Sequence, residues 1–375
     1  MPNIPYLRPR LVPLEEFAGY LRGLENDRIY SNFGPLNSRF EERVVTEYFG
    51  GTGAVTTVNN ATSGLMLAIA LAKRAGGRYA VMPSFTFAAT PLAAMWAGLE
   101  PFFVDVDPDD FCVSLPELQR TLEQLGDSVA VVVPYAAFGY PMDLAPYAGL
   151  VSRGIPVVVD AAASFGTCLE ATPFGTNFPG SIVFSFHATK AFGIGEGGLV
   201  YSRDAGFIDR LREAANFGFD ADKISRSNGL NAKLPEISAA VALATLDRFP
   251  EKKRQRMDVH AWYREDLESR GLLSAGWAMQ KQLGERAHVY FPLLCPPGVS
   301  NQKIVDRLAA GGIGMRTYFS PPCHQQPVFE NFRRGTLSNT NGIAQRVLSC
   351  PIWEELTRED VSAIVTELAD SAAMR

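Results

Sequence analysis

The chain has 375 residues, of which 47% are hydrophobic and 20% charged, and its formal net charge is −5 at pH 7. This composition is typical of a folded globular protein, and because a single core stops growing at roughly 250–300 residues, we expect one large and one small domain. The mild negative charge argues against nucleic acid as a partner.

The N-terminus and the cysteines indicate a cytoplasmic protein. The chain begins MPNIPYLRPRLVPLEEF, with prolines and charges where a signal peptide needs an apolar core, and no window is long and apolar enough to span a membrane. The five cysteines lie far apart without a C-x-x-C pair, which argues against a zinc site and against a disulfide framework. We therefore expect reduced thiols, no metal site and no membrane contact.

Short apolar runs alternate with helix-compatible segments, the pattern of an α/β fold with a mostly parallel sheet. We predict strands at 79–82, 101–106, 129–134, 155–160, 181–186 and 198–201, with helices at 61–75, 88–97, 115–125 and 143–152. A long helix at 234–270 is followed by a strand at 287–294 and by helices at 301–310 and 358–372. The sequence thus predicts a large domain over residues 1–250 and a small α+β domain over residues 251–375.

Two segments in the first third of the chain are suited to a phosphorylated, planar ligand. NNATSG (59–64) opens a predicted helix, whose free N–H groups favour phosphate. PSFTFAAT (83–90) follows a predicted strand and places an aromatic ring where it could lie against a planar group. Taken alone, the first segment also fits an ordinary helix cap, and the second an ordinary core aromatic.

An acid and a lysine complete the set. Asp160 ends the apolar run VVVD, and ligands of open α/β sheets gather at such carboxyl ends. There it could hold the ring nitrogen of pyridoxal phosphate (PLP) protonated, or simply cap a helix. Lys190, in SFHATKAFGIGEGG (185–198), follows a predicted strand, and a partly buried amine of lowered pKa suits Schiff-base chemistry. A solvated loop lysine is the alternative for Lys190 alone, but the four features together indicate PLP.

The same stretch contains G-x-G-x-x-G at Gly193, Gly195 and Gly198. A dinucleotide-binding loop needs a helix that begins at the third glycine. Gly198 instead leads into the predicted strand LVYS. An NAD-dependent dehydrogenase is therefore the weakest of the alternatives.

These segments resemble the DegT/DnrJ/EryC1/StrS family of sugar aminotransferases, PLP enzymes of the aspartate aminotransferase fold (fold type I). The resemblance runs nearly from end to end. Besides the segments above, it includes Gly34-Pro35, Phe40-Glu41, VDVDP (104–108), DAAASFG (160–166), Asn216-Phe217-Gly218, Gly229-Leu230-Asn231, GIGMRTYFSPPCHQQPVF (312–329) and LSCPIWEELTRED (348–360).

The resemblance implies PLP as the cofactor, with pyridoxamine phosphate as its intermediate form. By similarity Lys190 is the Schiff-base lysine and the proton shuttle, and Asp160 pairs with the pyridine nitrogen. The phosphate would be held by Ala61, Thr62 and Ser185, with Phe87 stacked on the ring.

Two positions concern the subunit interface and a departure from the family. Asn231 matches an asparagine that reaches the phosphate from the other subunit, which implies a homodimer with shared active sites. Ala163 stands where many members have glutamine, so an amide contact to the phenolic oxygen of the cofactor is missing, and water or another residue must substitute.

The resemblance also implies a substrate class, a keto sugar linked to a nucleotide, with L-glutamate as the amino donor. The segment SFHATK (185–190) resembles most the family members that favour a 4-keto-6-deoxyhexose on dTDP and a viosamine-type (gluco) product. The open alternatives are a 3-keto sugar, a UDP- or GDP-sugar, and a non-catalytic binding or regulatory protein of the same fold. The candidate substrate-binding residues are His187, Tyr318, His324, Arg316 and Gly34, and candidate cations for the diphosphate are Lys223, Arg226, Arg333 and Arg334.

Overall fold

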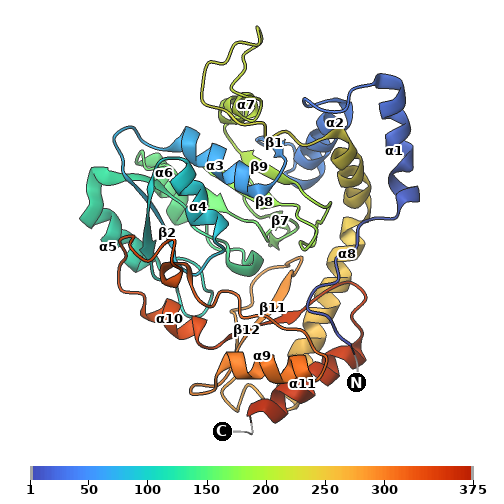
Figure 1. Ribbon diagram of the computed structural model, residues 1–375, viewed down its shortest axis with the longest axis vertical. Coiled ribbons are helices and arrows are strands. Elements are labelled where there is room, and N and C mark those ends of the chain that lie inside the picture. Colours follow the sequence, from blue (N-terminus) through green and yellow to red (C-terminus); the bar gives the residue numbers. More distant parts are fainter. Residues whose placement is uncertain (1–2, 373–375) are drawn as a thin grey trace.

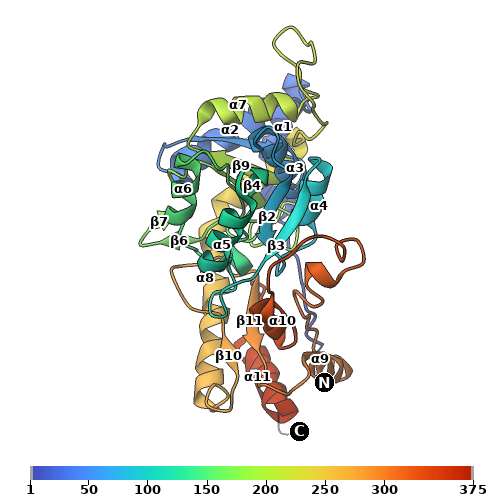
Figure 2. The ribbon, with the colours of Figure 1, turned by 90° about the vertical axis from the view of Figure 1, so that its left-hand side faces the viewer.

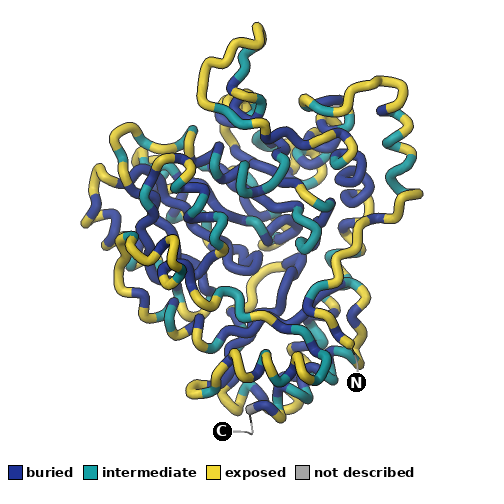
Figure 3. The backbone as a smooth tube through the Cα atoms, in the orientation of Figure 1, coloured by how far each residue is buried: buried dark blue, intermediate teal, exposed yellow. Residues whose placement is uncertain are grey.

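The computed structural model describes residues 3–372. Its centre is a sheet buried on both faces (Figures 1 and 3). The strands lie across this sheet in the order β1 (Ala54–Val58), β9 (Gly198–Ser202), β8 (Ser181–Ser185), β5 (Val158–Asp160), β4 (Val129–Val132), β2 (Tyr79–Pro83) and β3 (Glu100–Val104).

Two isolated parallel bridges, Val132 to Val157 and Tyr135 to Asp160, join β4 to β5 and make the sheet continuous. β9 pairs antiparallel with both β1 and β8, whereas the β5–β8, β2–β4 and β2–β3 pairs are parallel. The prediction of an α/β fold with a mostly parallel sheet is confirmed.

Successive side chains of a strand point to opposite faces of the sheet, and both faces are buried, which explains why the strands are apolar throughout. In β8, Ile182 and Phe184 point to one core and Val183 points to the other. The core around Val183 is covered by α3 (Ala61–Ala72), α4 (Ala89–Trp96) and α7 (Ala205–Ala214). The opposite core is covered by α2 (Pro35–Arg43), α5 (Leu115–Leu125), α6 (Ala145–Ser152) and the first half of α8 (Glu236–Ser269).

A smaller α+β unit lies at one end of the molecule (Figures 1 and 2). Its antiparallel sheet has the order β10 (Ala278–Met279), β11 (Tyr290–Leu294) and β12 (Val347–Pro351). The second half of α8 packs on this sheet together with α9 (Asn301–Ala310) and α11 (Arg358–Ala372). This unit has its own core, centred on Tyr263, Phe291 and Ile364.

Two connections join the large and small units. α8 runs unbroken through the expected domain boundary at residue 250, with Pro250 inside the helix. The N-terminal segment lies against the small unit, because Ile4 forms a parallel bridge with Ile313 and belongs to its core.

The remaining elements are short or peripheral. α1 (Leu14–Asp27) packs on α8, and β6 (Cys168–Leu169) forms a hairpin with β7 (Thr172–Pro173). The others are α10 (Ser338–Ala344), a π-helical turn η1 (Val44–Tyr48), and the 3-10 turns η2 (Gly126–Ser128), η3 (Ala137–Gly139) and η4 (Cys323–Gln325).

Within residues 3–372 no helix is long and apolar enough to cross a membrane, and no group of three or more His, Cys, Asp or Glu side chains is placed to hold a metal ion. All five cysteines are free thiols.

Candidate active site

A cavity of about 580 Å³ opens at the carboxyl ends of β5 and β8, between the large sheet and the small unit. Eight of the residues predicted for the site line it: Ala61, Thr62, Phe87, Asp160, Ser185, His187, Lys190 and Tyr318. The other lining residues are Leu7, Asn60, Ser63, Leu65, Ala89, Tyr135, Ala162, Thr189, Glu196, Tyr290 and Phe319.

Lys190 is carried by the loop that joins β8 to β9. The loop folds back on itself, since the Lys190 N–H donates to the His187 carbonyl (2.8 Å) and the Ala188 N–H donates to the Gly195 carbonyl (2.7 Å). A Cβ on Gly193 would lie 2.6 Å from the Ala188 carbonyl oxygen, and Gly195 has φ +101°. The glycines therefore permit this bend, and β9 rather than a helix begins at Gly198, as the sequence predicted.

Burial lowers the pKa of the Lys190 amine, and the negative charge of Asp160 opposes this effect. A lowered pKa leaves a larger share of the amine neutral, which is the form that attacks a carbonyl carbon. The position and the lowered pKa of Lys190 suit a nucleophile and a proton carrier.

Asp160 is the last residue of β5 and is only 2% exposed. Its Oδ2 accepts a hydrogen bond from the Thr90 hydroxyl (2.6 Å), and its Oδ1 accepts one from the Ala162 N–H (3.1 Å). Burial raises the pKa of Asp160, while these two hydrogen bonds and the charge of Lys190 oppose the rise. Asp160 forms no ion pair with any described residue, so it is a buried acid without a bonded cation.

The N-terminus of α3 faces the same cavity. The Asn60 side chain caps this helix by accepting from the Ser63 N–H (2.9 Å), and Ala61 and Thr62 form the first turn. A Cβ on Gly198 would lie 2.8 Å from the Ala61 nitrogen, so glycine there lets β9 pass close to the helix end. The free N–H groups and the helix dipole make this turn chemically suited to a phosphate group.

Aromatic rings form the remaining walls. Phe87 is 59% exposed and lines the cavity, so much of its side chain is free to contact a ligand. Tyr290 and Tyr318 come from the small unit and lie edge-on to each other, with ring centroids 5.6 Å apart. The cavity therefore draws on both units of the chain.

His187 and Glu196 contribute polar groups near Lys190. Nδ1 of His187 lies 2.8 Å from the Thr189 hydroxyl and 3.3 Å from the Thr189 nitrogen, and Nε2 lies 3.6 Å from the Glu196 carboxylate. Glu196 keeps 65% of its side chain exposed, so this pair is open to a polar substrate.

Five other predicted site residues do not line the cavity of the single chain. Ala163 is buried against Gly139, and His324 is buried with its Nδ1 2.7 Å from the Ser84 hydroxyl. Gly34 caps α2 beside Glu236. The exposed residues are Arg316, which lies over the ring of Tyr6, and Asn231, which pairs with Asn216. Their functional roles stay predictions.

The four candidate cations for the diphosphate also lie away from the cavity. Lys223 is exposed, and Arg226 bonds to Asp220 (2.8 Å). Arg333 donates to the Tyr79 hydroxyl (3.1 Å), and Arg334 donates to the Glu330 carbonyl (3.0 Å).

Sequence reasoning missed several lining residues, among them Tyr135, Glu196, Tyr290 and Phe319. Two carried a usable signal. Tyr135 directly follows a predicted strand, and Glu196 lies in the same loop as Lys190. Tyr290 and Phe319 enter from the small unit, whose docking on the large one no local pattern reveals.

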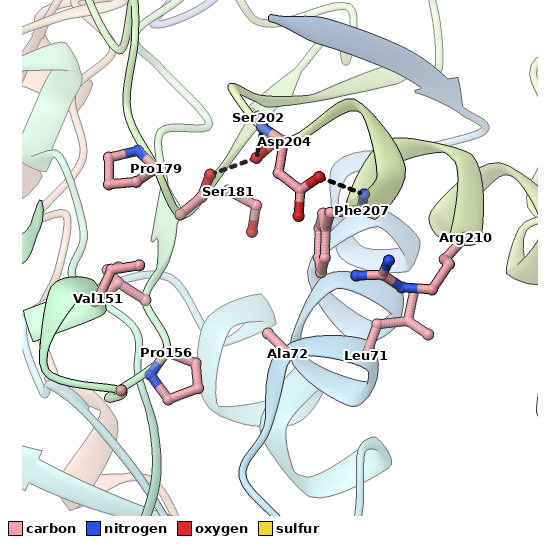
Figure 4. A pocket seen from close by; sticks show the side chains of 13 residues that line it. Leu71, Ala72, Val151, Pro156, Pro179, Ser181, Ser202, Asp204, Phe207 and Arg210 are labelled. Carbon is pink, nitrogen blue, oxygen red and sulfur yellow. Dashed lines mark hydrogen bonds between the residues drawn. The ribbon is translucent and has the colours of Figure 1, made fainter.

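A second cavity, of about 270 Å³, lies at the other end of β8 and carries no comparable chemistry (Figure 4). Two of its polar side chains are already used within the chain, whereas the buried Ser181 hydroxyl has no hydrogen-bond partner among the described residues. Ser202 donates to the Gly180 carbonyl (2.8 Å) and accepts from the Asp204 N–H (3.1 Å), and the Asp204 carboxylate caps α7 through the Phe207 N–H (3.2 Å).

PLP fits the chemistry of the first cavity. A protonated ring nitrogen would supply the cation that the buried Asp160 carboxylate lacks. The first turn of α3 offers free donors for a phosphate, Lys190 offers an amine for an aldehyde, and Phe87 offers an exposed aromatic ring. These groups match the ring nitrogen, the phosphate, the aldehyde and the ring face of the cofactor in chemical character.

Known proteins resemble the chain over nearly its whole length. It is 30% identical to protein Rv3402c of Mycobacterium tuberculosis (strain ATCC 25618 / H37Rv), covering 99% of this chain and 90% of that protein. A crystal structure assigned as a PLP-dependent aminotransferase from Bacillus cereus ATCC 10987 superposes with a TM-score of 0.97 at 46% identity, covering 98% of this chain and all of that one.

The structure of DesI in the presence of its TDP-sugar product gives a TM-score of 0.89 at 32% identity, covering 100% of this chain and 94% of that chain. The model of the DegT/DnrJ/EryC1/StrS aminotransferase family matches residues 14–369. The protein has the type I fold of PLP-dependent aminotransferases and belongs to the DegT/DnrJ/EryC1/StrS aminotransferase family.

Proposed function

We propose that this aminotransferase moves the amino group of L-glutamate to a 4-keto-6-deoxyhexose carried on dTDP, and that the product is the gluco isomer of the dTDP-4-amino-4,6-dideoxyhexose. The observation that carries the proposal is the cavity in which Lys190, Asp160 and the N-terminus of α3 meet. The 32% identity to DesI, whose structure was solved with a TDP-sugar product, supports the substrate class.

PLP, when bound, supplies an electron sink for a negative charge on the substrate carbon. The protein would hold it through Asp160 at the ring nitrogen, through Ala61, Thr62 and Ser185 at the phosphate, and through Phe87 on the ring face. Asp160 would keep the ring nitrogen protonated, because a buried carboxylate is strongly stabilised by a bonded cation.

Lys190 would do the proton work. Its neutral amine takes the α-proton of glutamate and returns a proton to the former keto carbon of the sugar, so that the group ends each turnover as it began. The lowered pKa favours this exchange, because it leaves a larger share of the amine neutral than an ordinary lysine pKa of ~10.4 would.

The sugar would occupy the mouth of the cavity, where His187 Nε2, the Glu196 carboxylate and the Tyr318 side chain are available. These groups are suited to the hydroxyl groups of a hexose, which both donate and accept hydrogen bonds. The small unit and the Lys190 loop thus face the substrate from two sides.

The test is an absorbance spectrum of the PLP-loaded enzyme, recorded before and after L-glutamate and then after dTDP-4-keto-6-deoxyglucose. A yellow band that bleaches with glutamate and returns with the sugar would support the proposal, and NMR of the product would report the position and orientation of the new amine. Bleaching without return would exclude this sugar, and 3-keto, UDP- and GDP-sugars would be tried next. Lys190→Ala should fold normally and transaminate nothing.

We also propose a homodimer with shared active sites. Within the described residues, Lys190 is the only lysine or arginine that lines the cavity, so a single chain offers no further cation for a sugar diphosphate. The loop between Asn216 and Asn231 projects outward with Phe217 45% and Ile224 47% exposed (Figure 1). Burying these side chains on a second copy would bring Asn231 and its neighbours to the partner's site.

Mixing tests the sharing. Lys190→Ala and Asn231→Ala subunits would be purified separately, mixed under mild denaturant and assayed after dilution. Activity above the sum of the two parents means that one hybrid site combines both intact residues. Activity equal to that sum, or a monomer by light scattering, would contradict the proposal.

A further inference from the structure

One hydroxyl in the cavity has no role in the account above. Tyr135 lines the cavity, is 5% exposed and lies three residues beyond the end of β4 at Val132. Its oxygen accepts a hydrogen bond from the Phe138 N–H (3.3 Å). In the described part of the chain its own proton goes to no acceptor, so Tyr135 has a hydrogen bond to give.

Strand register fixes where this donor lies. Tyr135 and Asp160 form a parallel bridge, in which the Ala136 N–H donates to the Asp160 carbonyl and the Asp160 N–H donates to the Pro134 carbonyl (both 2.9 Å). Directly paired residues of adjacent strands project to the same face of a sheet. The Tyr135 side chain therefore stands beside the Asp160 carboxylate, on the cavity side.

The acceptor of this donor is not Asp160 itself. The Asp160 oxygens accept from Thr90 and Ala162, and no hydrogen bond joins the Tyr135 hydroxyl to either of them. The proton is thus available to a ligand that occupies the cavity next to Asp160. A buried hydroxyl proton without an acceptor carries a free-energy cost, which a ligand oxygen would remove.

The residue at position 163 cannot donate a hydrogen bond to the phenolic oxygen of PLP, which is such an acceptor. Ala163 has no amide, is buried, and does not line the cavity. Resting on the proposed function, we propose that the Tyr135 hydroxyl donates a hydrogen bond to the phenolic oxygen of PLP. A tyrosine bridged to Asp160 just beyond the end of β4 thereby does the work that a side-chain amide at position 163 would do.

Tyr135→Phe tests this with the smallest change, because it removes only the hydroxyl. The matched control is Tyr140→Phe, which removes a hydroxyl from a buried tyrosine on the same segment that does not line the cavity. Thermal melts of the cofactor-free proteins would show whether either variant is impaired in folding.

Two readouts apart from activity are measured, the PLP dissociation constant and the pH titration of the absorbance band of the PLP-loaded enzyme. Tyr135→Phe should weaken PLP roughly ten-fold. It should also move the titration to higher pH, because a phenolic oxygen that has lost a donor holds its neighbouring proton more tightly. Tyr140→Phe should change neither.

A Tyr135→Phe variant with wild-type PLP affinity and titration would overturn the inference, as would a change confined to the KM of the sugar. If the wild type binds no PLP at all, the proposed function fails first, so the two failures are distinguishable.

Discussion

The hydrogen bond from Thr90 to Asp160 offers a sharp test of how the site is tuned. Thr90 is fully buried on α4, and its hydroxyl lies 2.6 Å from Asp160 Oδ2. Thr90→Val keeps the branched shape and removes the donor. Loss of this donor destabilises the ionised carboxylate of Asp160 relative to its protonated form, so the pKa of Asp160 should rise further.

The size of the effect follows from the kind of bond. A hydrogen bond to a charged group contributes about 1.5–3 kcal/mol, which corresponds to roughly a 10- to 100-fold loss in PLP affinity or turnover. The acidic limb of the pH–rate profile should move to higher pH, because a carboxyl of raised pKa ionises later as pH increases.

Thr86→Val is the matched control. The Thr86 hydroxyl bonds to Thr90 (3.0 Å) and not to Asp160. Thr86→Val removes only the bond between the two threonines, at a cost of about 0.5–1.5 kcal/mol in unfolding free energy, and it leaves the Thr90 hydroxyl bonded to Asp160. PLP is titrated into both variants, and single-turnover spectra are recorded over roughly four pH units around neutrality. The comparison separates the loss of the bond to Asp160 from the loss of an ordinary hydrogen bond in the core. Equal effects on PLP binding, or a wild-type pH profile in Thr90→Val, would refute the reasoning.

Three further predictions concern other parts of the molecule. Because burial lowers the pKa of Lys190, the rate at which the cofactor-free enzyme captures PLP should rise with pH to a plateau, with a midpoint below the ordinary lysine pKa of ~10.4. Asp160→Asn should lower this midpoint further, because the charge of Asp160 opposes the effect of burial. A rate that still climbs above that pH would contradict the prediction. Phe87→Ala should leave the unfolding free energy nearly unchanged, since the ring is 59% exposed, yet weaken PLP several-fold in a fluorescence titration. Glu236→Ala removes both acceptors from the first turn of α2 and should lower the unfolding free energy by about 2–4 kcal/mol in urea, whereas Glu236→Gln should cost less.

The elements that could be predicted are those whose burial produces a recognisable pattern of apolar residues in the local sequence. β8 and its parallel neighbours are apolar throughout because both of their faces are covered, and α5, α9 and α11 were expected with the bounds they have. β1 was missed because its polar residue Thr57 is paired only in three dimensions, with Glu41 through its N–H (2.7 Å) and hydroxyl (3.0 Å). α2 was missed for a similar reason, since Glu236, its capping carboxylate, comes from the start of α8.

The same distinction explains which site residues the sequence could reveal. Asp160 ends a strand that is recognisable on its own, and Lys190 lies in the loop that follows another such strand, so their positions follow from local pattern and general rules for α/β sheets. Thr90 and Tyr135 gain their importance only because α4 reaches Asp160 and β4 lies beside β5. Strand order is a property of the whole chain, so the groups that adjust the acid could be identified only after the sheet was assembled. The proposed roles of Tyr135 and Thr90 would place the control of the Asp160 pKa and of cofactor hydrogen bonding in contacts between strands and helices that no single sequence motif contains.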